Sequence, residues 1–219
     1  MANLDDLIHR WHLGWQSSRD LPDAELTDDA IWVHCVQPGR EFEVFSRRAD
    51  EDPDSVRRLA ARVLAARDHT WLTVTTDDLG RAAAAVEAAG LRVLHRSETM
   101  MAADLTRHPR RPLDPAFTSE VQVKGPCISV LIHDAAGTLA ARGQIGIAGG
   151  DAVADRIETT PEFRRRGLGA VVMGALAAEA ASRGVHNGLL IASEEGRHLY
   201  SSLGWERVAD VLIAQPPAV

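Results

Sequence analysis

The sequence has few of the residues that mark disulfide-stabilised, zinc-binding or membrane-spanning proteins. Its two cysteines, Cys35 and Cys127, lie in separate apolar stretches, which indicates two buried thiols rather than a disulfide framework or a zinc site. No apolar run approaches the roughly 18 residues of a membrane helix, and Asp5 and Asp6 stand where a secretory signal would be basic. We therefore expect a cytoplasmic protein with no membrane partner.

Lysine is almost absent, so the positive charge of the chain is carried by arginine. Lys124 is the only lysine, and 24 basic residues against 31 acidic residues give a formal net charge of -7. This balance argues against a nucleic-acid partner, because a polyanion would be repelled over most of the surface. Arginine suits bidentate contacts with phosphate groups. A phosphate-binding function would therefore require a local cluster of arginines.

Hydrophobic periodicity predicts an α/β chain whose two halves have the same order of elements. In the first half we expect helices at residues 4–15, 54–66 and 77–89 and strands at residues 30–36, 41–46, 70–75 and 91–105. In the second half we expect strands at residues 121–123, 127–133, 138–147, 151–159, 187–192 and 206–214 and helices at residues 167–183 and 194–203. The first half is therefore interpreted as a diverged structural copy of the second.

A proline-rich segment separates the two halves. Residues 106–115 contain His108-Pro109-Arg110-Arg111-Pro112 and Asp114-Pro115, which is too rich in proline for regular structure. We expect a diverged N-terminal α/β domain at residues 1–106 and a second domain at residues 107–219. Antiparallel strands followed by helix-linked strands predict a mixed, mostly antiparallel sheet flanked by helices.

One segment of the second half predicts an anion site. The strand at residues 151–159 leads through Arg164-Arg165-Arg166-Gly167-Leu168-Gly169 into the start of a helix. A helix N-terminus presents unpaired backbone N–H groups and the positive end of the helix dipole. Glycine allows a ligand to approach the backbone closely, and arginine matches the geometry of phosphate. The expected ligand is a pyrophosphate, and a basic surface loop with ordinary turn glycines is the alternative.

Two other kinds of nucleotide site fail on the same residues. A dinucleotide-binding fingerprint needs a third glycine where Val172 stands, and no acidic residue ends the following strand before Ser193. A nucleoside-triphosphate loop needs a lysine followed by serine or threonine, and Lys124 is far from this segment.

From about residue 120 to residue 214 the chain resembles the GNAT acyltransferases. The family signature is Arg or Gln, two residues, Gly, one residue, then Gly or Ala, which Arg164, Gly167 and Gly169 fit. Pro161 before the loop is similar to the family. So is the segment Leu199-Tyr200-Ser201-Ser202-Leu203-Gly204-Trp205, which resembles the family ending Leu-Tyr-x-x-x-Gly-aromatic. The resemblance implies a GNAT-like fold, with a diverged GNAT-like copy as the N-terminal half.

The resemblance implies acetyl-CoA as the co-substrate, and no metal is expected. Its pyrophosphate would lie on the backbone N–H groups of residues 165–170, and its pantetheine arm would lie along residues 157–159. The residues expected to contact it are Ile157, Glu158, Thr159, Arg164, Arg165, Arg166, Gly167, Leu168, Gly169, Ala170 and Ser193. A helix N-cap explains Ser193 equally well.

Direct acyl transfer needs an acid for the leaving thiolate and a base for the attacking ammonium. The resemblance implies that Tyr200, the only tyrosine, is the acid, and a tyrosine packed in the core is the alternative. Strand alternation places Asp155 on the face opposite Arg156 and Glu158, unless a bulge intervenes. Asp155 is slightly favoured as the base, Glu158 follows closely, and a water chain is the third option.

The chain departs from the family at the acceptor site. The usual fold inserts two helices between its first two strands, whereas residues 121–127 pass almost directly from one strand to the next. The N-terminal half, with its tryptophan-bearing first helix, is expected to complete an acceptor pocket between the halves. No second Arg-x-x-Gly-x-Gly lies between Ser46 and Ser55, so one acyl-CoA site per chain is expected.

The expected function is transfer of an acetyl group to a primary amine of a small molecule or peptide. Retained Tyr200 favours an enzyme. The alternative is a noncatalytic acyl-CoA-binding regulatory module, which the unassigned base and the missing acceptor helices leave open. The sequence also leaves a homodimer open.

Overall fold

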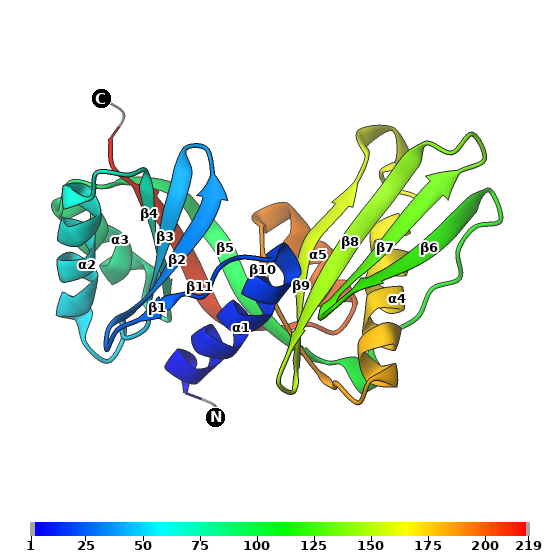
Figure 1. Cartoon of the computed structure of the whole chain (residues 1–219), viewed down its shortest axis with the longest axis horizontal. Helices are drawn as coiled ribbons and strands as arrows, with labels where there is room; N and C mark the ends of the chain where they lie inside the picture. The colour runs from blue at the N-terminus through cyan, green and yellow to red at the C-terminus, as the bar shows by residue number, and fades with distance from the viewer. Residues whose placement is uncertain (1–2, 218–219) are drawn as a thin grey trace.

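One sheet of eleven strands runs through the computed structural model, which describes residues 3–217 (Figure 1). The strand order is β1-β2-β3-β4-β11-β5-β10-β9-β8-β7-β6. The first half contributes β1 (Glu25–Leu26), β2 (Ala30–Gln37), β3 (Arg40–Ser46), β4 (Thr70–Thr76) and β5 (Arg92–Asp104). The second half contributes β6 (Phe117–Lys124), β7 (Cys127–Asp134), β8 (Leu139–Ala148), β9 (Asp151–Thr159), β10 (Asn187–Ala192) and β11 (Glu206–Gln215).

The two halves exchange their last strands at the centre of the sheet. Strand β11 lies between β4 and β5, and β5 lies between β11 and β10, all in antiparallel pairing. Only β3–β4 and β9–β10 are parallel pairs. The expectation of a mixed, mostly antiparallel GNAT-like sheet is therefore confirmed. The boundary between residues 106 and 107 stays a prediction, because β11 of the second half is placed among strands of the first.

Five α-helices cover the sheet unequally. They are α1 (Leu4–Arg19), α2 (Pro53–Ala65), α3 (Leu79–Ala88), α4 (Leu168–Ser182) and α5 (Glu194–Ser202), with short 3-10 turns η1 (Leu105–Arg107) and η2 (Pro161–Phe163). Neighbouring residues of β3, Val44 and Phe45, belong to opposite clusters: Val44 packs with α2 and α3, and Phe45 packs with α1. Since α4 packs with Met101 of β5 and α1 with the adjacent Met100, α1 covers the face opposite α4.

Helix α1 belongs to the first half in sequence but lies against the second half in space (Figure 1). Its Gly14 faces Val153 of β9 so closely that a Cβ at Gly14 would lie 2.7 Å from the Cβ of Val153. Ion pairs hold the helix at both ends: Asp5 pairs with Arg47 at 2.6 Å and Arg19 pairs with Asp155 at 2.8 Å. These contacts extend the helix to Arg19, beyond the expected end at residue 15.

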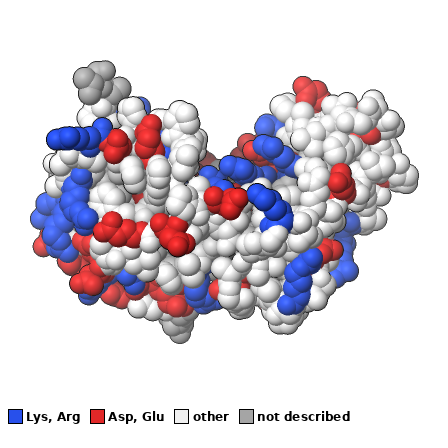
Figure 2. All heavy atoms as spheres, viewed as in Figure 1, with Lys and Arg blue, Asp and Glu red and all other residues white. Residues whose placement is uncertain are grey.

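The first and second halves form two lobes, which are joined through β5, β10 and β11 (Figure 1). The lobes enclose a hollow, which we call the inter-lobe cleft (Figure 2). Its N-terminal wall carries β5 and its C-terminal wall carries β9. Basic and acidic atoms gather deep in this hollow in the space-filling view (Figure 2).

Most expected elements lie within one or two residues of their observed bounds, and the exceptions are the end of α1 and the two edges of the sheet. Strand β6 begins at Phe117 rather than at residue 121, and the short β1 was not expected. The expectation of two buried thiols was wrong, since Cys35 and Cys127 are free but only half-buried. Burial falls along β2 as its hairpin leaves the core, and Cys127 stands beside the β6–β7 turn.

No helix within residues 3–217 combines the length and apolar character needed to cross a membrane.

Candidate acyl-coenzyme A site

The candidate site begins where β9 and β10 diverge. Only residues 151–153 of β9 pair with residues 187–189 of β10, although β9 continues to Thr159 and β10 to Ala192. On its other side β9 stays paired with β8 as far as Thr159. The edge of β9 facing β10 is therefore open beyond Val153. An extended ligand with amide groups can pair with such an edge as an added strand would.

A β-bulge at Arg156 changes which side chains share a face of β9. Asp155 lies opposite Gln144 and Glu158 lies opposite Arg142, so β9 has one more residue than β8 between these pairs. Arg156 takes up the extra residue with a positive φ of 52°. The bulge overturns the simple alternation, because it shifts the period by one residue. Asp155 and Glu158 therefore share the face covered by α1.

The loop after β9 presents a row of free backbone donors. Positive φ values of 62° at Arg165 and 76° at Gly167 turn the chain into α4, and no side chain caps the helix at Gly167. Within residues 3–217, the N–H groups of residues 165–169 have no hydrogen-bond acceptor. The N–H of Ala170, expected to join them, instead donates to the carbonyl of Gly167 at 3.0 Å. This row and the helix dipole suit a phosphate group.

A cavity of about 920 Å³ lies over this loop and the open edge of β9. It is lined by Ile157, Glu158, Thr159, Arg164, Arg165, Gly167, Leu168, Gly169, Ala170 and Ser193, which are all the expected contacts except Arg166. The Arg166 guanidinium instead lies over the Phe117 ring, 5.2 Å from its centroid, where a cation–π contact holds it.

Strand β8 also lines the cavity, with Leu139, Ala141 and Arg142. The sequence analysis missed these residues because no motif marks them. Their position follows from the pairing of β8 with β9, which a local pattern does not show.

Helix α5 forms the other wall of the cavity. Ser193 caps the helix by accepting a hydrogen bond from the N–H of Gly196 at 3.2 Å, and it also lines the cavity. Tyr200 lies on the same helix with 8% of its surface exposed. Burial raises the pKa of Tyr200 to about 12, and the negative charge of Asp155 adds to the shift. The phenol is therefore protonated at neutral pH, as an acid must be before it donates.

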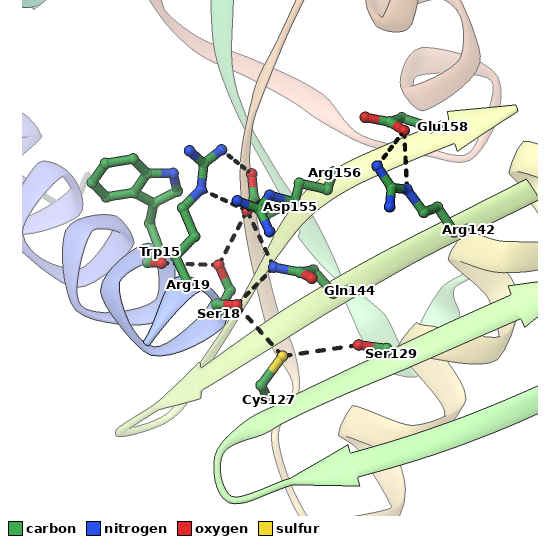
Figure 3. A network of polar contacts seen from close by, with 10 residues as sticks. All are labelled: Trp15, Ser18, Arg19, Cys127, Ser129, Arg142, Gln144, Asp155, Arg156 and Glu158. Atoms are coloured by element: carbon green, nitrogen blue, oxygen red, sulfur yellow. Dashed lines mark hydrogen bonds and ion pairs between the residues drawn. The ribbon is translucent and has the colours of Figure 1, made fainter. Parts of the chain in front are cut away.

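Asp155 is held by three side chains from two elements, α1 and β8 (Figure 3). Arg19 binds both of its oxygens at 2.8 Å, the Ser18 hydroxyl donates at 3.2 Å, and Gln144 donates at 3.4 Å. Its side chain is 10% exposed. Protonation of this carboxylate would weaken every one of these bonds. Asp155 thus anchors the end of α1 to β9.

Glu158 is placed differently. It is exposed, it lines the cavity, and it forms an ion pair with Arg142 at 2.8 Å (Figure 3). Its carboxylate is open to solvent and is bonded to a single side chain.

No group of three or more His, Cys, Asp or Glu side chains gathers as a metal site in the part of the chain that the structure describes.

Comparison with known proteins agrees with this architecture. Residues 150–212, which include the loop and α5, match the model of the FR47-like protein family. A GCN5-related N-acetyltransferase from Kribbella flavida is similar at a TM-score of 0.74 and 15% identity, over 100% of this chain and 97% of that one. No curated protein matches the sequence.

Two further solved structures are similar over most of the chain. A GCN5-related N-acetyltransferase from Sphaerobacter thermophilus has a TM-score of 0.62 and 14% identity, over 87% of this chain and 77% of that one. A tandem GNAT protein from the clavulanic acid biosynthesis pathway has a TM-score of 0.58 and 14% identity, over 87% and 80%. The resemblance to the GNAT superfamily is therefore confirmed: the chain has the fold of the GNAT N-acetyltransferases in a two-half form, with an FR47-like segment around its loop.

Proposed function

We propose that the protein is an N-acetyltransferase, which transfers an acetyl group from acetyl-CoA to a primary amine of a small molecule or peptide. The observation that carries this proposal is the row of free N–H groups at residues 165–169, which opens into the 920 Å³ cavity beside the unpaired edge of β9.

Each part of the site suits one part of this co-substrate. The loop N–H groups would hold the pyrophosphate, with Arg164 and Arg165 adding positive charge at the cavity wall. The open edge of β9 at residues 157–159 would pair with the amides of the pantetheine arm. The co-substrate supplies the acetyl thioester, and the protein holds it where β9 and β10 diverge.

Tyr200 is the proposed acid that protonates the leaving thiolate. Its raised pKa keeps the phenol protonated at neutral pH, so that it holds a proton to donate when the thiolate departs. Of the two carboxylates on β9, Asp155 is committed to Arg19 and is proposed to position α1. Glu158, exposed and lining the cavity, is the β9 carboxylate left as a candidate base.

The inter-lobe cleft is the proposed acceptor site. Strands β6 and β7 are joined by a tight turn, so no helices lie between them. Helix α1 covers β8 and β9 on that face instead. An amine in the cleft would reach the divergence of β9 and β10 from the face opposite α4.

Calorimetric titration with acetyl-CoA tests the proposed function. A Cβ at Gly169 would lie 3.0 Å from Leu199 Cδ2, so Gly169→Val fills the cavity beside the free N–H groups. The matched control is Gly80→Val, at the second residue of α3, where a Cβ meets nothing closer than 3.7 Å.

We expect the wild type and the Gly80 variant to bind at one site per chain and Gly169→Val to bind at least about 100-fold more weakly. Circular dichroism confirms that each variant is folded. A folded wild type that shows no saturable binding, or a Gly169 variant that binds like the wild type, would overturn the proposal.

The second candidate function is a noncatalytic acyl-CoA-binding regulatory module. The observation that favours it is the ion pair of Asp155, the carboxylate first expected as the base, with Arg19. Such a module would bind the same thioester without turning it over, so measurements of turnover separate it from an enzyme.

A further inference from the structure

The wall of the inter-lobe cleft opposite β9 is β5, and its open end lies beside the proposed site. Thr99 of β5 pairs with Ala192, the last residue of β10, and the next residue, Ser193, lines the cavity. Before Thr99, β5 pairs with β11 alone, so its edge toward the second half is free. Glu98 is the first residue beyond the end of β10.

Strand register places Glu98 across from the reacting end of the proposed site. Leu189 of β10 pairs in parallel with Val153 of β9. Three residues further along both strands, Ala192 is level with Arg156. Glu98, one residue beyond the Thr99–Ala192 pair, is therefore level with residues 157–158 on the opposite wall.

The side chain of Glu98 points to the acceptor face. Glu98 lies opposite Val211 of β11, and Val211 belongs to the cluster under α1. Residues directly opposite in an antiparallel pair share a face. The carboxylate is half-buried, and within residues 3–217 it has neither an ion pair nor a hydrogen bond. Asp155, across the cleft, has donors on both oxygens.

The charges around Glu98 come from several elements. Burial raises the pKa of Glu98 above its usual range, and His95 on β5 and Arg40 on β3 oppose that shift. Arg40 forms its own ion pair with Glu43 and stacks on Trp71, 4.9 Å from the ring centroid. Because Glu43 already partners Arg40, Glu98 remains free for a ligand cation.

The remaining titratable groups near Arg40 are Cys35, Arg19 and Asp155. Arg19 and Asp155 neutralise each other, and burial raises the pKa of Cys35, which keeps the thiol neutral. Glu98 is therefore the unpaired acid of this cluster.

We infer that Glu98 binds the ammonium group of the acceptor and accepts its proton, so that the N-terminal half supplies the base for chemistry on the C-terminal half. The inference rests on the proposed function. It places the base on β5 rather than at Glu158. Glu158 lies where the pantetheine arm is proposed to bind, and its carboxylate is already paired with Arg142.

The Glu98 carboxylate takes one proton from the ammonium, and the neutral amine nitrogen attacks the thioester carbonyl carbon. The C–N bond forms and the C–S bond breaks. Tyr200 donates its proton to the leaving thiolate and regains one from the amide nitrogen, directly or through water. Glu98 releases its proton to solvent, so the products are an amide, a free thiol and one proton.

The test measures thiol release from acetyl-CoA with a panel of amino acids, polyamines, aminosugars and peptides with free N-termini. On the amine that the wild type uses, we expect Glu98→Gln to lower kcat/KM about 100-fold while acetyl-CoA binding is retained. The deficit should shrink as the pH approaches the pKa of the acceptor amine, which then loses its proton without a base. Glu98→Asp should retain the pH dependence of the wild type.

The rival base is tested with Glu158→Gln, and the matched control is Glu120→Gln, an exposed residue of β6. Loss of less than about threefold in a folded Glu98→Gln, an unchanged deficit at high pH, or a larger loss in Glu158→Gln would overturn the inference and leave the proposed function standing. A wild type that binds acetyl-CoA but acetylates none of the amines would overturn both. If Glu98→Gln does not fold, Glu98→Ala takes its place, with the same expected loss and the same recovery at high pH.

Discussion

The two halves have one plan but differ at the pair of strands that makes a ligand site. The order β3-α2-β4-α3-β5 in the first half corresponds to β9-α4-β10-α5-β11 in the second. Residues 42–46 of β3 pair with residues 70–74 of β4, right up to Ser46 at the end of β3. The equivalent strands β9 and β10 separate after Val153. At this pair of strands, within the described residues, the second half therefore leaves backbone donors and acceptors open where the first half does not.

The turns that lead into α2 and into α4 also differ in charge. The approach to α2 contains three acids, Asp50, Glu51 and Asp52, beside two arginines, whereas the approach to α4 contains three arginines, one acid and Gly167. Asp50 accepts hydrogen bonds from the Thr76 hydroxyl and from the N–H of Asp77 at 2.9 Å, which joins the β3 and β4 ends. An anion would meet the carboxylate of Asp50 there.

The comparison shows that fold alone does not make the site. In our proposal, strand divergence and the sign of the charge at one turn decide which copy can hold a phosphate. The first half has kept the scaffold and, in our proposal, serves as a wall of the acceptor cleft.

The largest effect should come from α5, because its first-half counterpart α3 lacks the proposed acid. Tyr200 is the seventh residue of α5, and the seventh residue of α3 is Ala85. We expect Tyr200→Phe to lower kcat about 100- to 1,000-fold with acetyl-CoA affinity retained, because only proton donation is lost. Timed assays of thiol release measure kcat, and calorimetry measures the affinity for acetyl-CoA. Unchanged turnover would favour the regulatory module over an enzyme.

The next largest effect compares the ion pairs at the two ends of α1. Asp155→Asn leaves the Arg19 guanidinium, 20% exposed, without its charge partner, and we expect the free energy of unfolding to fall by about 3 kcal/mol. The pair that ties α1 to the first half, Asp5 with Arg47, is more exposed, and Asp5→Asn should cost about 1 kcal/mol. Urea denaturation measures both. Equal losses would contradict the view that α1 is docked chiefly on the second half.

The smallest effect concerns pH and the contact of α1 with the first half. His12 is 1% exposed beside Phe45, and burial, aided by the charge of His9, lowers the pKa of His12 to about 4 from 6.5. The unfolded chain binds this proton below pH 6.5 and the folded chain does not, so stability should fall as pH drops from 6.5 toward 4. The contribution between pH 7.5 and 5 is about 2 kcal/mol.

His12→Leu should remove that part of the pH dependence, measured by urea denaturation at the two pH values. His69→Leu, at an exposed position, is the matched control. If the wild type and His12→Leu show the same pH dependence, His12 is not the group that titrates.

Much of the C-terminal site could be predicted from the sequence because its parts are local. The strand, the Arg-Gly loop and the helix that follows it are contiguous, and the cavity they line contains the expected residues apart from Arg166. The base was harder to assign. The bulge at Arg156 puts Glu158 on the same face as Asp155, and the bulge depends on pairing with β8, not on the residues of β9 alone.

By itself, the sequence determined where helices and strands form and where an anion can meet a helix N-terminus, because propensity, periodicity and turn chemistry act over a few residues. Only the tertiary structure decided the exchange of β5 and β11, the anchoring of Asp155 by Arg19 and the free carboxylate of Glu98 on the facing wall. Each of these joins residues far apart in the chain. Such contacts depend on which strands become neighbours in the sheet, and that choice is made by packing of the whole chain rather than by any local pattern.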